Sequence, residues 1–188
     1  MNRAIAGWML ATFALMTSTA IAADVAGVKL DDTIRLDGQE LRLNGAGLRT
    51  RLMFKVYVAS LYLPQRANDV QSVLAKAPRR IQMNMLRSLS ADQLADALND
   101  GLADNNPPQT LAAIKPQIEQ LSAIMKAFKD VKENDVVTLD FIGGATRVGL
   151  NGEPRGAIPG EAFNQALSRI WLGDKPAQSE LRKALLGL

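Results

Sequence analysis

The chain contains neither cysteine nor histidine. Without cysteine it can form no disulfide, so its stability depends on packing alone. Catalytic triads that use either residue are excluded, and so are nearly all structural zinc sites, because those need thiolate or imidazole ligands. We therefore expect no bound metal. Any chemistry at a site has to use arginine, lysine, tyrosine, carboxylate or hydroxyl groups.

Clusters of a single charge are also missing. Lysine and arginine number 22 against 19 acidic residues, a formal net charge of +3, but the two signs are interspersed and no basic run is present. Nucleic acid and a membrane surface are therefore not the expected partners. Beyond the first 22 residues the sequence has no second long apolar stretch, so we expect no stable membrane insertion.

The N-terminus has the pattern of a cleavable secretory signal. Arg3 precedes an uncharged apolar stretch over residues 5–16, and Ala20-Ile21-Ala22 fits the A-x-A pattern of a signal peptidase site. The apolar stretch is shorter than the roughly 20 residues that span a bilayer, and a lipoprotein signal would need a cysteine. We predict a signal peptide over residues 1–22 and one periplasmic or secreted domain over residues 23–188.

The first part of this domain has the pattern of antiparallel strands. Residues 33–43 form two alternating segments around Asp37-Gly38, a dipeptide suited to the positive backbone angles of a tight turn. The glycine-bearing segment 44–47 predicts a connection into a long strand over residues 52–63. That strand is apolar on both alternating faces, which is typical of a strand in the middle of a covered sheet.

The remaining elements come in separate groups of strands and helices. Further strands are expected over residues 79–86, 135–142 and 146–150. Helices are expected over residues 69–76, from a Ser90–Gln93 capping box to about residue 105, over residues 111–128 with the regular part after Lys115, and over residues 159–171 and 177–186. Such grouping favours an α+β fold with a largely antiparallel sheet.

Few residues in this chain are candidates for chemistry. Gly45-Ala46-Gly47 lacks the third glycine of a dinucleotide loop and precedes a strand instead of a helix, so no cofactor is expected. Arg49 and Arg51 either extend to solvent or present a guanidinium at the end of an apolar cleft, where it would bind a carboxylate or enolate. Arg87 is a second cation at the same rim or a surface charge, and we favour the surface.

Methionines supply the adaptable apolar side chains. Met53, Met83 and Met85 are ordinary core residues or the lining of a site for a flexible lipid chain. Tyr57, on the long strand, is a core residue or a neighbour of Arg49 in the same pocket. The aspartates at positions 92, 96 and 100 are spaced four apart, which indicates a solvated helix face and not a metal site.

The run LNGAGLRTRLMFKVYVASLYL over residues 43–63 resembles the bacterial chalcone isomerase-like proteins, exported relatives of chalcone isomerase and of plastid fatty-acid-binding proteins. The segments LRSLSADQL at 86–94, AIPG at 157–160 and WLG at 171–173 support the likeness. It covers the chain from Val28 onward. The resemblance implies an open-faced β-sandwich, in which a large antiparallel sheet packs against a layer of helices around an apolar cleft.

The resemblance also implies a role for one arginine. Arg49 falls on the residue that stabilises the substrate oxyanion in the isomerases and pairs with the carboxylate in the fatty-acid binders. Two polar catalytic positions of the isomerases fall on Tyr57 and Leu94 here, and a further polar position near Ile170 is apolar. An isomerase needs a polar network as charge develops. A retained cation in a more apolar cleft suits an apolar tail with an anionic head.

Three functions remain open at this point. We expect a non-catalytic binding protein for a fatty acid or similar apolar carboxylate, anchored by Arg49. Tyr57 would assist, and the apolar lining would come from Met53, Met83, Met85 and Leu94. One alternative is an isomerase or intramolecular lyase for a small carbonyl compound, with Arg49 at the oxyanion and Tyr57 as acid or base. The other is a module that docks to an envelope protein, whose identity the sequence does not give.

Overall fold

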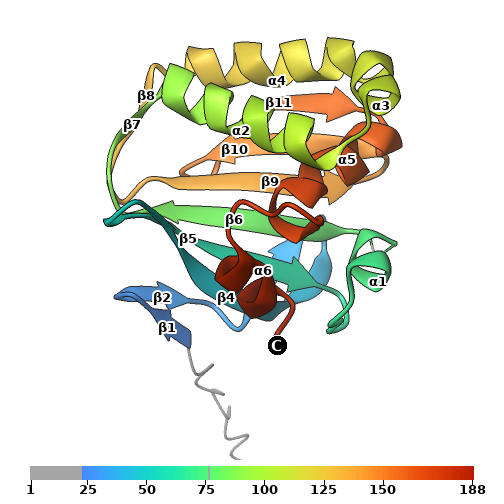
Figure 1. Cartoon of the computed structure of the whole chain (residues 1–188). Coiled ribbons are helices and arrows are strands. Elements are labelled where there is room, and N and C mark those ends of the chain that lie inside the picture. Colours follow the sequence, from blue (N-terminus) through green and yellow to red (C-terminus); the bar gives the residue numbers. More distant parts are fainter. Residues whose placement is uncertain (1–22, 76) are drawn as a thin grey trace, which may run out of the picture.

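The protein folds as a curled sheet with helices packed against one face (Figure 1). The structure, a computed structural model, describes residues 23–75 and 77–188. The predicted signal peptide over residues 1–22 lies outside the described residues. No helix within the described ranges is long and apolar enough to cross a membrane.

The main sheet has seven strands in the order β11-β10-β9-β6-β5-β4-β3, with every neighbouring pair antiparallel. Its strands are β3 Thr33–Leu36, β4 Gln39–Arg51, β5 Phe54–Leu63, β6 Arg79–Met85, β9 Val136–Ile142, β10 Ala145–Leu150 and β11 Glu153–Pro159. Two small antiparallel pairs join β1 Ala23–Val25 to β2 Val28–Leu30, and β7 Leu89–Ser90 to β8 Asp130–Val131. The predicted antiparallel sheet is confirmed.

The helices form a layer over one face of this sheet (Figure 1). They are α1 Val70–Leu74, α2 Ala91–Asn105, α3 Pro108–Ala113, α4 Lys115–Ala127, α5 Glu161–Leu172 and α6 Ser179–Leu185. The predicted Ser90–Gln93 capping box closes the start of α2, and its buried stripe is Leu94, Leu98 and Leu102. This stripe packs with Ile81 and the rest of the main core on the helix side of the sheet.

Strand β5 is buried on both faces, as its apolar pattern predicts. Tyr57 and Leu61 belong to the core under the helices, whereas Val58 and Tyr62 belong to a second core on the opposite face. That second core is completed by the β1–β2 pair and β3, which contribute Leu30 and other apolar residues. The strand is therefore fixed in the middle of the sheet, and the first residues of β5 place the site described below.

The structure corrects the predicted connection at residues 44–47, which is part of the continuous strand β4. The chain reverses later, at Leu52 and Met53. The glycines are needed for a different reason: a Cβ at Gly45 would collide with the backbone carbonyl oxygen of Ala184 in α6. Glycine in β4 thus permits the close approach of a helix.

Strands β1, β2 and β11 are not predicted from the sequence, and their local patterns explain why. The first two have three residues each, too few to show an alternation. Strand β11 contains two prolines and a glycine, which reduce its β propensity. Its position at the edge of the sheet tolerates proline. The helix expected from residue 159 consequently begins at Glu161.

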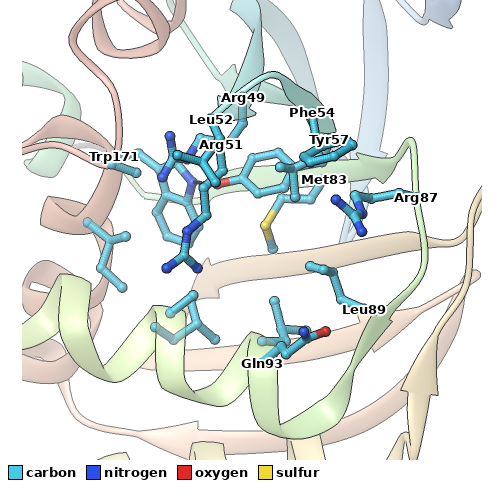
Figure 2. A pocket seen from close by; sticks show the side chains of 16 residues that line it. Arg49, Arg51, Leu52, Phe54, Tyr57, Met83, Arg87, Leu89, Gln93 and Trp171 are labelled. Carbon is cyan, nitrogen blue, oxygen red and sulfur yellow. Dashed lines mark hydrogen bonds between the residues drawn. The ribbon is translucent and has the colours of Figure 1, made fainter.

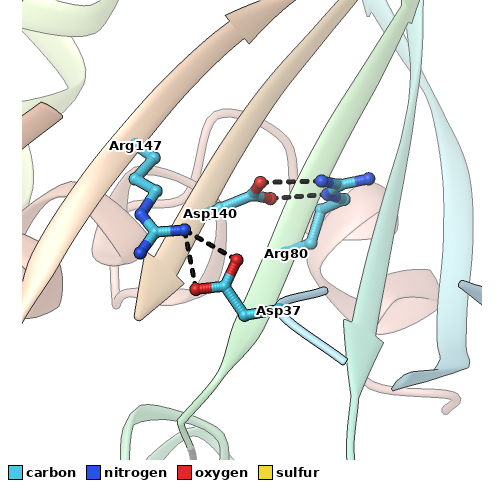
Figure 3. A network of polar contacts seen from close by, with 4 residues as sticks. All are labelled: Asp37, Arg80, Asp140 and Arg147. Carbon is cyan, nitrogen blue, oxygen red and sulfur yellow. Dashed lines mark hydrogen bonds and ion pairs between the residues drawn. The ribbon is translucent and has the colours of Figure 1, made fainter. Parts of the chain in front are cut away.

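The sheet face opposite α2 carries two ion pairs (Figure 3). Arg80 and Asp140 lie opposite each other on β6 and β9, with Nη2 2.7 Å from Oδ2, and their side chains are 19% and 11% exposed. Arg147 on β10 contacts Asp37 in the β3–β4 turn at 2.8 Å, and these side chains are about half exposed. The second contact shows that the sheet curls until its first hairpin reaches β10.

We expect the two pairs to contribute unequally to stability. Asp140→Asn removes the partner of a partly buried guanidinium, so it should lower the free energy of unfolding by about 2 kcal/mol. Asp37→Asn breaks an exposed pair and should cost roughly 0.5 kcal/mol or less. Urea denaturation of both variants measures the difference. Equal losses would contradict the assignment of Arg80–Asp140 as the stronger pair.

Candidate functional site

A cavity of about 330 Å³ lies between the β4–β5 hairpin and α2. Much of its apolar wall comes from β5, β6, α2 and α5 and includes Val56, Met83, Leu94, Leu98 and Ile170. The connection between α5 and α6 closes a further side through Ala177. Small-molecule sites occupy roughly 300–1000 Å³, so the cavity suits a compact or medium-length ligand.

Four of the six residues predicted for this site line the cavity: Arg49, Tyr57, Met83 and Leu94. The structure corrects the expectation for the other two. Met53 lies in the two-residue turn before β5 and is 94% exposed, and its neighbours Leu52 and Phe54 border the cavity in its place. Met85 is fully buried in the main core and does not reach the cavity wall.

Arg49 and Tyr57 are direct neighbours across the β4–β5 pair, so their side chains share one face of the sheet. Arg49 Nη1 donates to the backbone carbonyl of Thr50 at 2.5 Å and to Gln178 Oε1 at 3.4 Å. The same Gln178 oxygen accepts from the Thr50 amide at 2.9 Å. Gln178, just before α6, therefore positions the arginine, and a guanidinium with five N–H donors can still bind an anion.

The Tyr57 hydroxyl accepts a hydrogen bond from Trp171 Nε1 at 3.0 Å. Burial raises the pKa of Tyr57 above its ordinary value, and this effect exceeds the opposing influence of the Trp171 hydrogen bond and the Arg49 charge. The phenol is consequently neutral at pH 7 and available as a proton donor. It is a poor general base.

The chain's two tyrosines provide a test of this burial. Burial also raises the pKa of Tyr62, so both hydroxyls should remain protonated in the folded protein at pH 10, the ordinary tyrosine pKa. The pKa of each tyrosine is higher in the folded than in the unfolded protein. The folded protein therefore keeps its full stability below pH 10, the unfolded pKa, and loses stability as the pH rises above it. Absorbance at 295 nm should increase only with alkaline unfolding. A one-tyrosine step at or below pH 10, with unchanged circular dichroism, would contradict this.

The charges around the cavity are all of one sign. Arg49, Arg51 and Arg87 line it, and its described lining holds no carboxylate. Within residues 23–75 and 77–188, none of these three arginines forms an ion pair. Figure 2 shows Arg49 and Arg51 on the side of Trp171 and Arg87 on the opposite side. Cations along an apolar cleft concentrate the field that attracts an anion.

Arg87 is exposed, as the sequence interpretation favours, and it also borders the cavity. Its guanidinium carbon lies 5.0 Å from the centre of the Phe54 ring, within cation–π distance. The aromatic ring therefore holds this cation at the rim. Both interpretations of Arg87 therefore apply: it is a surface charge, as favoured from the sequence, and it is also a cation at the rim of the cavity.

The sequence does not predict Trp171 and Gln178 as residues of the site. Their partners Tyr57 and Thr50 are 114 and 128 residues away, so no local spacing connects them. The helix-face aspartates at 92, 96 and 100 are exposed, as predicted. No group of three potential metal-ligating side chains occurs among the described residues.

Comparisons with known proteins agree with this architecture. The family model described as chalcone isomerase-like matches residues 22–187. A similar solved structure is the crystal structure of an Arabidopsis thaliana fatty-acid-binding protein, with 16% identity, a TM-score of 0.65, and coverage of 85% of this chain and 92% of that one. Curated protein sequences give no match. The predicted fold class is confirmed.

Proposed function

The chain belongs to the chalcone isomerase-like family, and from this premise we propose that it is an exported, non-catalytic protein that binds a fatty acid or similar apolar carboxylate. One observation carries the proposal: an apolar cavity bordered by Arg49, Arg51 and Arg87, with no carboxylate in its described lining. An apolar wall and unpaired cations are complementary to an apolar tail and an anionic head.

The positions of these groups give the ligand an orientation. The tail would lie against Met83, Leu94 and Leu98 beneath the β4–β5 hairpin, where burial of each methylene contributes about 0.8 kcal/mol. The carboxylate would accept hydrogen bonds from Arg49, which Gln178 already positions. A guanidinium binds a carboxylate with two parallel hydrogen bonds, so this contact also selects planar anions.

The solved neighbour supports the proposal through its fold. That protein is described as a fatty-acid-binding protein, so the fold is compatible with such a ligand. The choice of a carboxylate for this chain depends on its own three arginines and apolar wall.

Ligand extraction tests the proposal. Protein purified without added lipid, extracted with organic solvent and analysed by mass spectrometry should yield an amphiphilic acid near one equivalent. Arg49→Ala should yield several times less, and Arg155→Ala, which removes an exposed charge on β11, should yield the wild-type amount. Wild-type protein that carries no acid, and takes up none when acids are added, would contradict the proposal.

Export is part of the proposal and has its own test. The charged start, the apolar stretch and Ala20-Ile21-Ala22 predict cleavage after residue 22. The intact mass of protein from a periplasmic or secreted fraction should therefore correspond to residues 23–188. An intact mass of the uncleaved chain in that fraction would contradict the predicted cleavage.

A second candidate, an isomerase acting on a small carbonyl compound, is favoured by the adjacency of Arg49 and Tyr57. Arg49 would stabilise an enolate and Tyr57 would donate a proton. The raised pKa of Tyr57 makes it a poor base, and proton abstraction requires one. Turnover of a chalcone panel above the buffer rate, lost in Tyr57→Phe, would favour this candidate over simple binding.

A further inference from the structure

The tip of the β4–β5 hairpin exposes three consecutive large apolar side chains. Leu52 is 91% exposed, Met53 94% and Phe54 59%. Among the described residues the remaining large apolar side chain that is exposed is Leu188, at 70%. Single exposed apolar residues are common on protein surfaces, but a contiguous group marks a contact surface.

The backbone conformation at this tip indicates that the fold does not require apolar residues there. The other two-residue hairpin turns place only small residues at their positive φ angles, as in Ala26-Gly27, Asp37-Gly38, Gly143-Gly144 and Asn151-Gly152. At this tip Leu52 has φ of +57°, a conformation that is costly for a bulky residue. Leu52 therefore has an unfavourable backbone conformation, and its exposed side chain gains little packing energy in return. A residue that is unfavourable for the local structure in this way is typical of a functional position.

Cations surround the same tip. Arg51 and Lys55 flank it in sequence, and Arg87 packs over the ring of Phe54; all three are exposed. Between residues 49 and 55 the sequence contains Arg49, Arg51 and Lys55 and no acidic residue. These cations do not form a continuous basic run in the sequence, because Arg87 reaches the tip from the connection between β6 and β7.

We propose that this hairpin tip docks on the anionic surface of a lipid bilayer. Leu52, Met53 and Phe54 enter the interfacial region, while the surrounding cations contact lipid phosphates. An apolar element rimmed by basic residues is the pattern that binds such an interface without spanning it. Leu52 and Phe54 also border the cavity. If the proposed function holds, docking places the mouth of the binding site against the membrane from which an apolar acid would enter.

Vesicle flotation tests the proposal with protein purified after export. Wild type should float with vesicles of phosphatidylglycerol and phosphatidylethanolamine and remain below phosphatidylcholine vesicles. Binding should weaken in 1 M salt, where the screening length falls to about 3 Å. Met53→Ser and Leu52→Gly should each weaken partitioning onto the vesicles about tenfold, as expected when one apolar side chain that enters the bilayer is removed. Leu188→Ser, a matched change at the other exposed apolar residue, should leave it unchanged.

Leu52→Gly separates docking from folding. Glycine adopts the positive φ of this position without strain, so the variant should melt at or above the wild-type temperature while its vesicle binding weakens about tenfold. The proposal would be overturned if the wild-type protein did not bind anionic vesicles, or if the variants floated as well as wild type. Self-association through the tip in solution, with no vesicle binding, would also overturn it in favour of a contact between two copies. Ligand binding measured without vesicles is independent of these results.

Discussion

Arg49→Ala is expected to weaken the binding of dodecanoate by about 10- to 100-fold, because a hydrogen bond to a charged group contributes about 1.5–3 kcal/mol. Of the three arginines that line the cavity, Arg49 is the one that we expect to bind the carboxylate. It lies across from Tyr57 on the neighbouring strand and is held by Gln178. Isothermal titration calorimetry of wild type and variant measures the loss directly.

Two controls separate the charge of Arg49 from its packing. Arg155→Ala removes the same charge from β11 and should leave the affinity within about twofold of wild type, since distant exposed charges are screened. The affinity of Arg49→Ala for dodecanol, which has no carboxylate, should be close to that of wild type. An equal loss for acid and alcohol would show that Arg49 acts through the fold and not through the anionic head.

Gly45→Ala should cause the largest loss of stability, about 3 kcal/mol. The added Cβ would meet the backbone carbonyl oxygens of Ala184 and Leu185 in α6. A flexible side chain can relieve such a contact by changing its rotamer, but backbone atoms of a helix cannot, so α6 as a whole has to move. Urea denaturation should show the loss, and ligand affinity should fall as well because Gln178, just before α6, contacts both Arg49 and Thr50.

Gly156→Ala is the matched control for this steric argument. A Cβ at Gly156, also within a strand, would meet the terminal Cδ1 of Ile124 at 2.5 Å. That methyl group can rotate away, so the cost should be about 1 kcal/mol or less. If both variants lose the same stability, the close approach of α6 to β4 is not what requires glycine at position 45.

Features that depend on neighbours in sequence were predicted correctly. The Asp37-Gly38 turn, the capping box at Ser90 and the apolar stripe of α2 each follow from local hydrogen bonding or helical spacing. Strand β5 was predicted to be central because both of its alternating faces carry apolar residues, and each face packs in a core. These signals need no knowledge of the tertiary structure.

The errors arise where a distant segment decides the conformation. Gly45 looks like part of a turn, but α6, some 140 residues later, requires it within a strand. The sequence predicts a strand from residue 52 and Met53 in the cavity lining, whereas the turn occupies Leu52 and Met53 and the strand starts at Phe54. A side chain in a turn does not follow the alternation of the strand, so it need not face the cavity that the strand lines.

The site was predicted only in part for the same reason. Arg49 was identified because the family resemblance marks it. Arg87 and Trp171 line the cavity from segments that are distant in sequence from the residues they contact there, Phe54 and Tyr57. The absence of a carboxylate from the described lining of the cavity is a property of the folded arrangement, because acidic residues are frequent in the sequence itself.

Fluorescence of Trp171 provides the most direct measurement of the central claim. Of the chain's two tryptophans, Trp8 lies in the predicted signal peptide, so the processed protein reports from the cavity wall alone. Titration with dodecanoate should saturate and shift the emission, with an affinity at least about tenfold higher than that for dodecanol, because only the acid carries the charge that the arginines bind. Equal affinities for the two, or no change in emission with either, would contradict binding of an apolar carboxylate at this site.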